Sequence, residues 1–233
     1  MSTTPEPEQT GLSPSRLAAL ADGIFAVAMT LLVLNLQVPH IPGELASGRL
    51  PHALLDLWPK FLTYALSFVV VGVYWVGQHN QFHYIRRVDR PFMWINILFL
   101  MGIAVIPFSA ALMGEYVHQQ VAVAIYGLNL VVVGALLYLV WWYATTNHRL
   151  VDKGLSHSVI QAGGRRVLAG VVLYLLAVGI SFLSTSMSVA LYILVPLLYM
   201  LPGRIDRHVM GRLTSNESRP HHHPQAYTSP EDR

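Results

Sequence analysis

The chain alternates long apolar runs with short polar segments, and charged residues mark where most runs end. A helix needs about 20 apolar residues to cross the hydrocarbon core of a bilayer. The pattern predicts four such spans, at residues 17–38, 61–82, 91–112 and 121–144. Between Arg166 and Arg204 there are 37 uncharged residues, and Ser184-Thr185-Ser186 is their one turn-like break. We therefore predict two short spans there, at 167–183 and 187–201.

The positions of the basic residues support this number of spans. Membrane proteins concentrate Lys and Arg in their cytoplasmic loops. With six spans, 13 of the 15 Lys and Arg residues lie on the side of the two termini, and Arg49 and Lys60 alone face the other side. A five-span model would move the last five arginines across the membrane. The pattern therefore predicts an all-α membrane protein with six transmembrane helices and both termini cytoplasmic.

The composition narrows the class of protein. Hydrophobic residues make up 54% of the chain and charged residues 12%, about half the roughly 25% that is typical of soluble domains. This excludes a soluble enzyme with a charged shell, and the absence of cysteine excludes a disulfide-stapled domain. Residues 1–15 and 204–233 are polar and contain several prolines, so we predict disordered tails on either side of a membrane domain at 16–203.

Three polar side chains on three different predicted spans stand out, because polar groups inside a membrane are costly and often functional. Asp22, His79 and Asn96 each lie about 9–10 Å along a helix from a basic residue of the cytoplasmic side. They therefore share one depth, and a mutual hydrogen-bond cluster would satisfy all three. Such a cluster either clamps the first three helices together or serves as a proton relay or ion site.

Two other patterns suggest ion binding less directly. His79 and His83 have the i, i+4 spacing of zinc ligands, but no acidic third ligand lies in the motif. The segment 71–74 is similar to a potassium-channel filter, yet the flanking Thr and Gly are absent. We therefore expect no metal and no cofactor. Three carboxylates in the outer loops form either a cation-attracting rim or a merely solvated surface: Glu44, Asp56 and Glu115.

The first span carries a stripe of large apolar residues. Val27, Leu31 and Leu34 follow i, i+4, i+7 spacing and share one helix face, with Thr30 beside them. The helix is apolar on all sides, however, and periodicity then does not separate a face toward lipid from a face toward a pore.

Part of the sequence resembles a known channel family. Arg16-x-x-x-Leu20-Ala21-Asp22-Gly23, followed by IFAVAMTLLVLNL, resembles the R-x-x-x-F-S-D-G signature of the lysosomal potassium channel family, transmembrane protein 175, in its bacterial and archaeal form. The second and third spans are similar to the family at several positions: Tyr64, Ser67, Phe68, Gly72, Tyr74, Trp75, His79, Asn96, Pro107 and Phe108. The last three spans match in hydropathy alone.

The resemblance implies a function and an assembly. The family forms homotetramers of six-helix subunits that conduct potassium in preference to sodium, with the first helix of each subunit lining the pore. Carried across, the apolar rings of the constriction fall on Val27, Leu31 and Leu34, with Thr30 as a nearby hydroxyl ring. The resemblance also assigns a polar network that holds the helices together: Arg16, Asp22, His79 and Asn96.

Two departures from the family pattern change what we expect of the site. Leu20 and Ala21 stand in place of Phe and Ser, and the missing hydroxyl predicts a thinner or rearranged network. Val27 is smaller than the expected Ile or Leu, which predicts a looser constriction. The implied partners are potassium ions, the lipid bilayer and further copies of the chain, without nucleic acid. The implied location is the cell membrane, as a multi-pass protein.

Two other functions compete with a channel. A proton-coupled secondary transporter would use Asp22 and His79, but such proteins usually show internal repeats, and the two halves of this chain show no convincing repeat. A membrane enzyme would need a nucleophile beside a base. Ser67 lies about 18 Å along the helix from His79, so the two cannot form that pair. We therefore expect no enzymatic activity.

Overall fold

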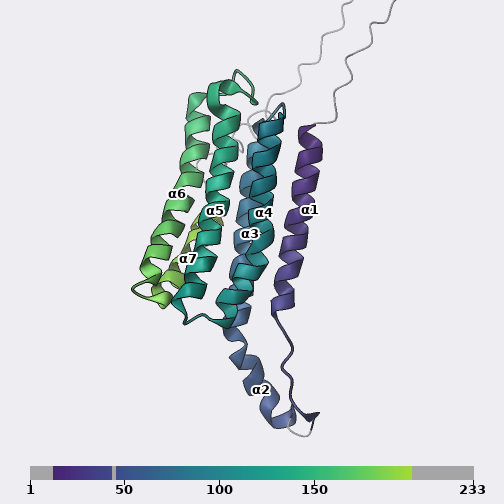
Figure 1. The fold of residues 1–233 in the computed structure, drawn as a ribbon, viewed down its shortest axis with the longest axis vertical. Helices are drawn as coiled ribbons and strands as arrows, with labels where there is room; N and C mark the ends of the chain where they lie inside the picture. Colours follow the sequence, from purple (N-terminus) through teal and green to yellow (C-terminus); the bar gives the residue numbers. More distant parts are fainter. Residues whose placement is uncertain (1–12, 44–45, 201–233) are drawn as a thin grey trace, which may run out of the picture. The chain divides into compact units, whose positions relative to one another are not determined.

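The computed structural model describes residues 13–43 and 46–200, and the regular structure within them is helical (Figure 1). Short 3-10 turns, η1 (Val33–Asn35) and η3 (Thr146–His148), follow two of the α-helices. The α-helices in chain order are α1 (Pro14–Leu32), α2 (Ala46–Asp56), α3 (Trp58–Tyr84), α4 (Arg90–Glu115), α5 (Gln120–Thr145), α6 (His157–Ser181) and α7 (Thr185–Met200).

The all-α membrane fold predicted from the sequence is confirmed, whereas six full spans and cytoplasmic termini stay predictions. Within the described ranges, α1, α3, α4, α5 and α6 are long and apolar enough to cross a bilayer. The sixth apolar helix, α7, has 16 residues. The break between α6 and α7 falls at residues 182–184, beside the serine-rich segment that predicted it. The predicted tails at 1–15 and 204–233 lie outside the described residues, apart from residues 13–15, two of which already belong to α1.

Two helices differ from the pattern of predicted spans. α6 begins at His157, ten residues before the predicted span, and so includes Arg165 and Arg166. Long basic side chains reach from a helix to the headgroup region, so a charge can mark the predicted edge of a span without ending the helix. α2 was not predicted at all, because its mixed sequence with a central Pro51 has no long apolar run.

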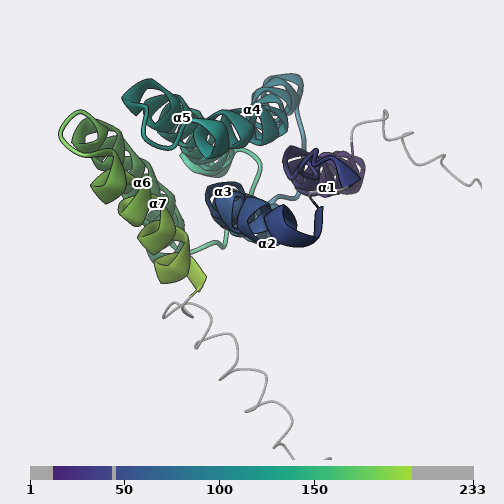
Figure 2. The same cartoon turned by 90° about the horizontal axis from the view of Figure 1, so that it is seen from below.

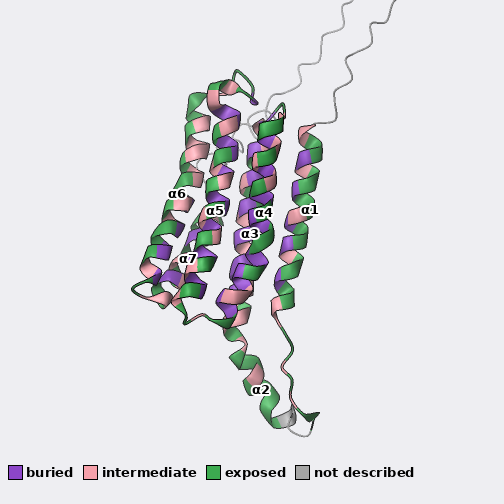
Figure 3. Cartoon of the chain, viewed as in Figure 1, coloured by how far each residue is buried: buried purple, intermediate pink, exposed green. Residues whose placement is uncertain are grey.

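The helices pack in a simple order. α5 contacts α4 on one side and α6 on the other, while α1 packs against α3 and α4 at one edge of the bundle (Figure 2). α7 returns to the same group, because Ser188 donates to the Ala177 carbonyl of α6 (2.8 Å) and Tyr192 to the Val123 carbonyl of α5 (3.1 Å). The buried residues lie where these helices face one another (Figure 3). α1 thus has neighbours on one side only.

The loops after α3 and α5 meet at one end of the bundle, which we call the basic end. Ile85 and Val151 form an isolated antiparallel bridge, and the Arg86 amide donates to the Leu150 carbonyl (2.8 Å). Leu17, at the start of α1, belongs to the hydrophobic cluster beneath these loops. The arginines that flank several predicted spans therefore share one end. Which side of the membrane this end faces stays a prediction.

Side-chain hydrogen bonds at seven-residue intervals join α3 to α5. In an apolar environment such bonds fix the rotation of one helix against the next. The interval matches the coiled-coil repeat, so the bonded residues stay on one side of α3. In order along α3, Ser67 bonds Tyr126 (3.1 Å), Tyr74 donates to the Leu130 carbonyl (2.7 Å) and Gln81 donates to the Leu137 carbonyl (3.3 Å).

Capping side chains define where two of the helices begin. Ser13 accepts from the Arg16 amide (3.4 Å) at the start of α1. Asp89 accepts from the Phe92 amide (2.9 Å) at the start of α4 and also from the Tyr143 hydroxyl of α5 (2.9 Å). An N-cap satisfies backbone N–H groups that have no partner within the helix. Asp89 therefore both starts α4 and attaches it to α5.

Candidate functional site: the first helix and its surroundings

One face of α1 is fixed against the bundle. The Phe25 ring packs against Phe99 of α4, with ring centroids 6.0 Å apart. Because one side of the helix is held in this way, the rotation of α1, and with it the direction of every other side chain, is determined. The buried residues of α1 are Leu17, Ala21, Phe25, Ala28 and Leu32.

The predicted pore residues, three on α1 and Leu34 on η1, lie on a side that their own chain leaves uncovered. Val27 is 56% exposed, Leu31 42% and Leu34 67%. Thr30 is exposed as well, and its hydroxyl donates to the Val27 carbonyl (2.8 Å). The chain therefore presents these four residues together as a continuous stripe. A single copy encloses no path along that stripe.

Asp22 and His79 come together through a residue that the sequence analysis had not placed in the network. The Trp75 indole N–H donates to Asp22 Oδ1 (2.8 Å). The ring of Trp75 lies against the ring of His79, with centroids 5.5 Å apart and planes inclined by 32°. Among the hydrogen bonds of the described residues there is none directly between Asp22 and His79. We call these three residues the Asp22 cluster.

The other two predicted network residues stand apart from the Asp22 cluster. Asn96 is fully buried, and its Nδ2 donates to the Phe92 carbonyl of its own helix (3.0 Å). Arg16 is exposed, and its guanidinium forms no ion pair within residues 13–43 and 46–200. A single copy therefore does not join Arg16 and Asn96 to Asp22 and His79.

Ring contacts place these polar residues at one level of the bundle. Asp22 lies three residues before Phe25 and Asn96 three residues before Phe99, on helices that run in the same direction (Figure 1). The Phe25–Phe99 contact therefore sets Asp22 level with Asn96. The bond from Trp75 brings α3 to the same level. The common depth that the sequence predicts for Asp22, His79 and Asn96 agrees with this register.

Two buried glutamines of α3 were not predicted as site residues from the sequence. Gln78 and Gln81 are 3% and 6% exposed. Within the described part of the chain, Gln78 Nε2, Gln81 Oε1 and Asn96 Oδ1 are buried without a hydrogen-bond partner. The Phe82–Phe92 ring contact sets Gln78 opposite Asn96 across two antiparallel helices. In the sequence, the seven-residue spacing of Ser67, Tyr74 and Gln81 indicates that one face of α3 carries polar residues toward a neighbouring helix.

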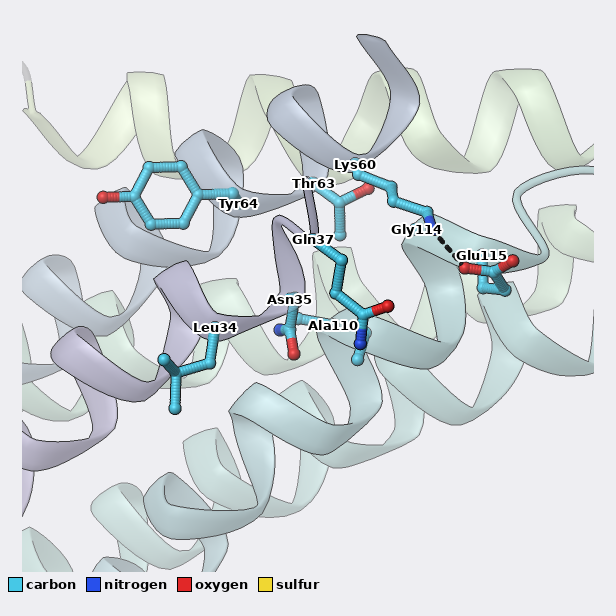
Figure 4. A pocket seen from close by; sticks show the side chains of 10 residues that line it. Leu34, Asn35, Gln37, Lys60, Thr63, Tyr64, Ala110, Gly114 and Glu115 are labelled. Carbon is cyan, nitrogen blue, oxygen red and sulfur yellow. Dashed lines mark ion pairs between the residues drawn. The ribbon is translucent and has the colours of Figure 1, made fainter. Parts of the chain in front are cut away.

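A cavity of about 220 Å³ lies at the end of the bundle opposite the basic end, which we call the α2 end (Figure 4). η1 with the segment that follows it, the start of α3 and the end of α4 line it. Leu34 borders this cavity, and so do Lys60 and Glu115, which form an ion pair. Asn35, also in the lining, donates to the Pro107 carbonyl of α4 (3.1 Å). The end of the exposed stripe is thereby attached to α4.

Metal binding finds no support in the geometry. The described residues contain no group of three or more His, Asp or Glu side chains that could hold a metal ion. The zinc alternative at His79 and His83 would need such a third ligand. The ring of His79 instead packs on Trp75, and that of His83 packs edge-on against Tyr84 (5.4 Å).

Known proteins are similar to this chain over a range that includes the residues described above. The model of the family described as endosomal/lysosomal potassium channel TMEM175 matches residues 16–107. A potassium channel of Streptomyces collinus is 37% identical over 188 residues, covering 79% of this chain and 90% of the relative. The human endosomal/lysosomal proton channel TMEM175 is 27% identical over 241 residues, and the match covers 47% of its length.

A solved structure agrees in fold as well as in sequence. The crystal structure of a lysosomal potassium-selective channel TMEM175 homolog from Chamaesiphon minutus matches with a TM-score of 0.72 and 31% identity. The match covers 81% of this chain and 96% of that one. The shared fold, the shared first helices and the identity across most of a full-length relative lead to one conclusion: this chain belongs to the TMEM175 family of ion channels.

Proposed function

We propose that the protein is a potassium-preferring channel formed by four copies around a central pore, with α1 of each copy lining that pore. The observation that carries this proposal is the uncovered stripe of Val27, Leu31 and Leu34. One helix face cannot surround a water path, whereas a closed ring of identical copies can. The bacterial relatives named as potassium channels support potassium as the ion.

The stripe then supplies the constriction. Each residue is repeated around the axis, so Val27, Leu31 and Leu34 form successive apolar rings. An apolar ring passes ions when it is wide enough to stay wet, and it closes by losing its water. Thr30 adds a ring of hydroxyls whose protons are held by the Val27 carbonyls. The hydroxyl oxygens stay available to a passing cation.

The Asp22 cluster has a structural role in this proposal. The bond from Trp75 to Asp22 joins α1 to α3 on the side next to the uncovered stripe. It therefore helps to fix how far α1 stands from the bundle, and with it the pore radius. Arg16, which is exposed, joins this network through contacts between copies, whereas Asn96 contributes from inside one copy, where it is fully buried. The alternative, a proton-coupled transporter, would instead use Asp22 and His79 to carry protons.

The rest of the chain has its place in the proposed channel as well. Residues 16–203 form the channel domain, with 1–15 and 204–233 as cytoplasmic tails, and the protein works in the cell membrane. Under this topology the basic end faces the cytoplasm, where Lys and Arg concentrate. The α2 end then forms the outer mouth of the pore.

Recording from the purified protein in planar bilayers tests the proposal. We expect unitary current steps whose reversal potential follows the potassium gradient when sodium balances it on the other side. Because vertebrate relatives are named proton channels, a pH gradient is applied separately. A reversal potential that follows the pH gradient instead of the potassium gradient contradicts potassium preference. Proton-coupled flux without unitary steps contradicts a channel altogether and favours the transporter.

A further inference from the structure

The cavity at the α2 end contains a charge pair whose function the pore alone does not explain. Lys60 at the start of α3 and Glu115 at the end of α4 form an ion pair on the wall of this cavity (Figure 4). Their side chains are 27% and 53% exposed. Ion pairs of this exposure contribute little to stability, about 0–1 kcal/mol. The ion pair therefore contributes little to holding α3 and α4 together.

The position of the pair connects it to ion flow. Leu34, the last residue of the pore stripe, borders the same cavity as Lys60 and Glu115. A cavity of about 220 Å³ has room for about seven water molecules at roughly 30 Å³ each. A charge on its wall therefore acts on the mouth of the pore through water and over a short distance. The amide side chains of Asn35 and Gln37 also line this space.

We propose that the Lys60–Glu115 pair sets the cation conductance of the outer mouth, because Lys60 neutralises a carboxylate that would otherwise concentrate cations beside Leu34. The inference rests on the proposed function, in which the pair is repeated around the pore. A paired Lys and Glu present a dipole whose field falls off quickly, whereas an unpaired Glu presents a full negative charge. A mouth lined by charges of one sign raises the local concentration of the opposite ion.

The ionic strength decides how far this effect reaches. The Debye length is about 30 Å at 0.01 M salt and about 3 Å at 1 M. At low salt an unpaired Glu115 therefore acts on the whole outer mouth. At high salt its field is screened within the cavity. A change that is large at low salt and absent at high salt separates a charge effect from a change in pore shape.

The test compares unitary conductance in Lys60→Met with that of the wild type. We expect inward potassium conductance to rise by about two-fold or more at 10 mM potassium and to equal the wild type at 1 M. Arg49→Met is the matched control, because Arg49 carries the same charge on the same side but does not line the cavity. It should change the low-salt conductance less than Lys60→Met does.

Two further variants make the test reciprocal. Glu115→Gln leaves Lys60 unpaired and should lower the low-salt conductance, and the double variant Lys60→Met/Glu115→Gln should return to the wild-type value. A double variant that keeps the rise seen in Lys60→Met overturns the inference, as does an equal conductance in all variants. If the wild type gives no cation steps, the proposed function fails and this inference fails with it. Wild-type steps that no variant alters overturn this inference alone.

Discussion

Trp75 donates its indole N–H to the Asp22 carboxylate, and this makes Asp22 the acceptor of a charge-assisted bond between two helices. Such bonds are roughly twice as strong as neutral ones. Asp22→Asn keeps an acceptor oxygen but loses the charge, whereas Asp22→Ala leaves the indole without a partner. Comparing the two variants therefore separates the effect of the Asp22 charge from the effect of the hydrogen bond itself.

We expect Asp22→Ala to destabilise the assembled protein by about 1–3 kcal/mol and Asp22→Asn to cost less. Thermal unfolding in detergent, followed by tryptophan fluorescence, measures both. His79→Ala should lose part of the same free energy, because the two residues act through Trp75 and their effects are not additive. Strict additivity of Asp22→Ala and His79→Ala would argue that the two do not share one cluster.

A substitution of Val27 gives the sharpest test of the proposed pore. Val27→Asn would place an amide from every copy where an apolar ring stood, so the ring should stay wet. We expect a higher open probability and a smaller preference for potassium over sodium, because the barrier to a partly hydrated ion is lowered. Reversal potentials in asymmetric potassium and sodium measure the change.

The contrary outcome for Val27 is equally specific. Its side chain is 56% exposed in one copy, which also fits a face that contacts lipid or a neighbouring helix. There the amide would alter insertion or assembly and leave selectivity untouched. Unchanged reversal potential and open probability in a correctly assembled variant would remove Val27 from the pore.

At the scale of elements, close packing of α5 against α6 and α7 depends on a glycine. A Cβ on Gly127 would overlap the Tyr192 hydroxyl of α7 and lie 2.5 Å from Val178 Cγ2 of α6. Tyr192 also donates to the Val123 carbonyl, one helical turn before Gly127. The side chain that holds α7 to α5 therefore fills the space that Gly127 leaves.

We expect Gly127→Ala to destabilise the protein by about 1–3 kcal/mol, the usual cost of adding atoms to a packed core. Gly179→Ala is the control, because a Cβ there meets no atom within 4 Å and the helix gains a better helix former. Its melting temperature should equal or exceed that of the wild type. A Gly127→Ala variant as stable as the Gly179→Ala variant would show that α7 can move aside.

At the scale of the whole molecule, the proposed pore requires oligomerisation. Four copies of the 25.9 kDa chain have a combined mass of about 104 kDa (4 × 25.9), and native mass spectrometry from detergent micelles should give this value. Val27→Asn should form the same tetramer, since in the proposed arrangement the side chain faces the pore rather than the contact between copies. A monomer or dimer that still conducts would contradict the arrangement with α1 at the centre.

The sequence by itself determined the class of protein, the apolar helices found in the described residues and the level of the polar residues. Those properties follow from run length, charge position and the fixed rise of a helix, which are local quantities. It also placed Val27, Thr30, Leu31 and Leu34 on one face, because helical periodicity is local too. It missed α2 and the true start of α6, because neither coincides with the edge of an apolar run.

Tertiary structure alone decided which polar groups meet. A membrane helix is apolar on all sides, so its sequence pattern does not say which face turns toward a neighbour. The packing of Phe25 on Phe99 fixes the rotation of α1, and that rotation leaves Asp22 to accept from Trp75 while Asn96 stays buried elsewhere. It also brings Leu34 to the same cavity as Lys60 and Glu115, residues 55 positions apart in the chain. Contacts between residues so distant in sequence depend on how the helices pack, which no local pattern encodes.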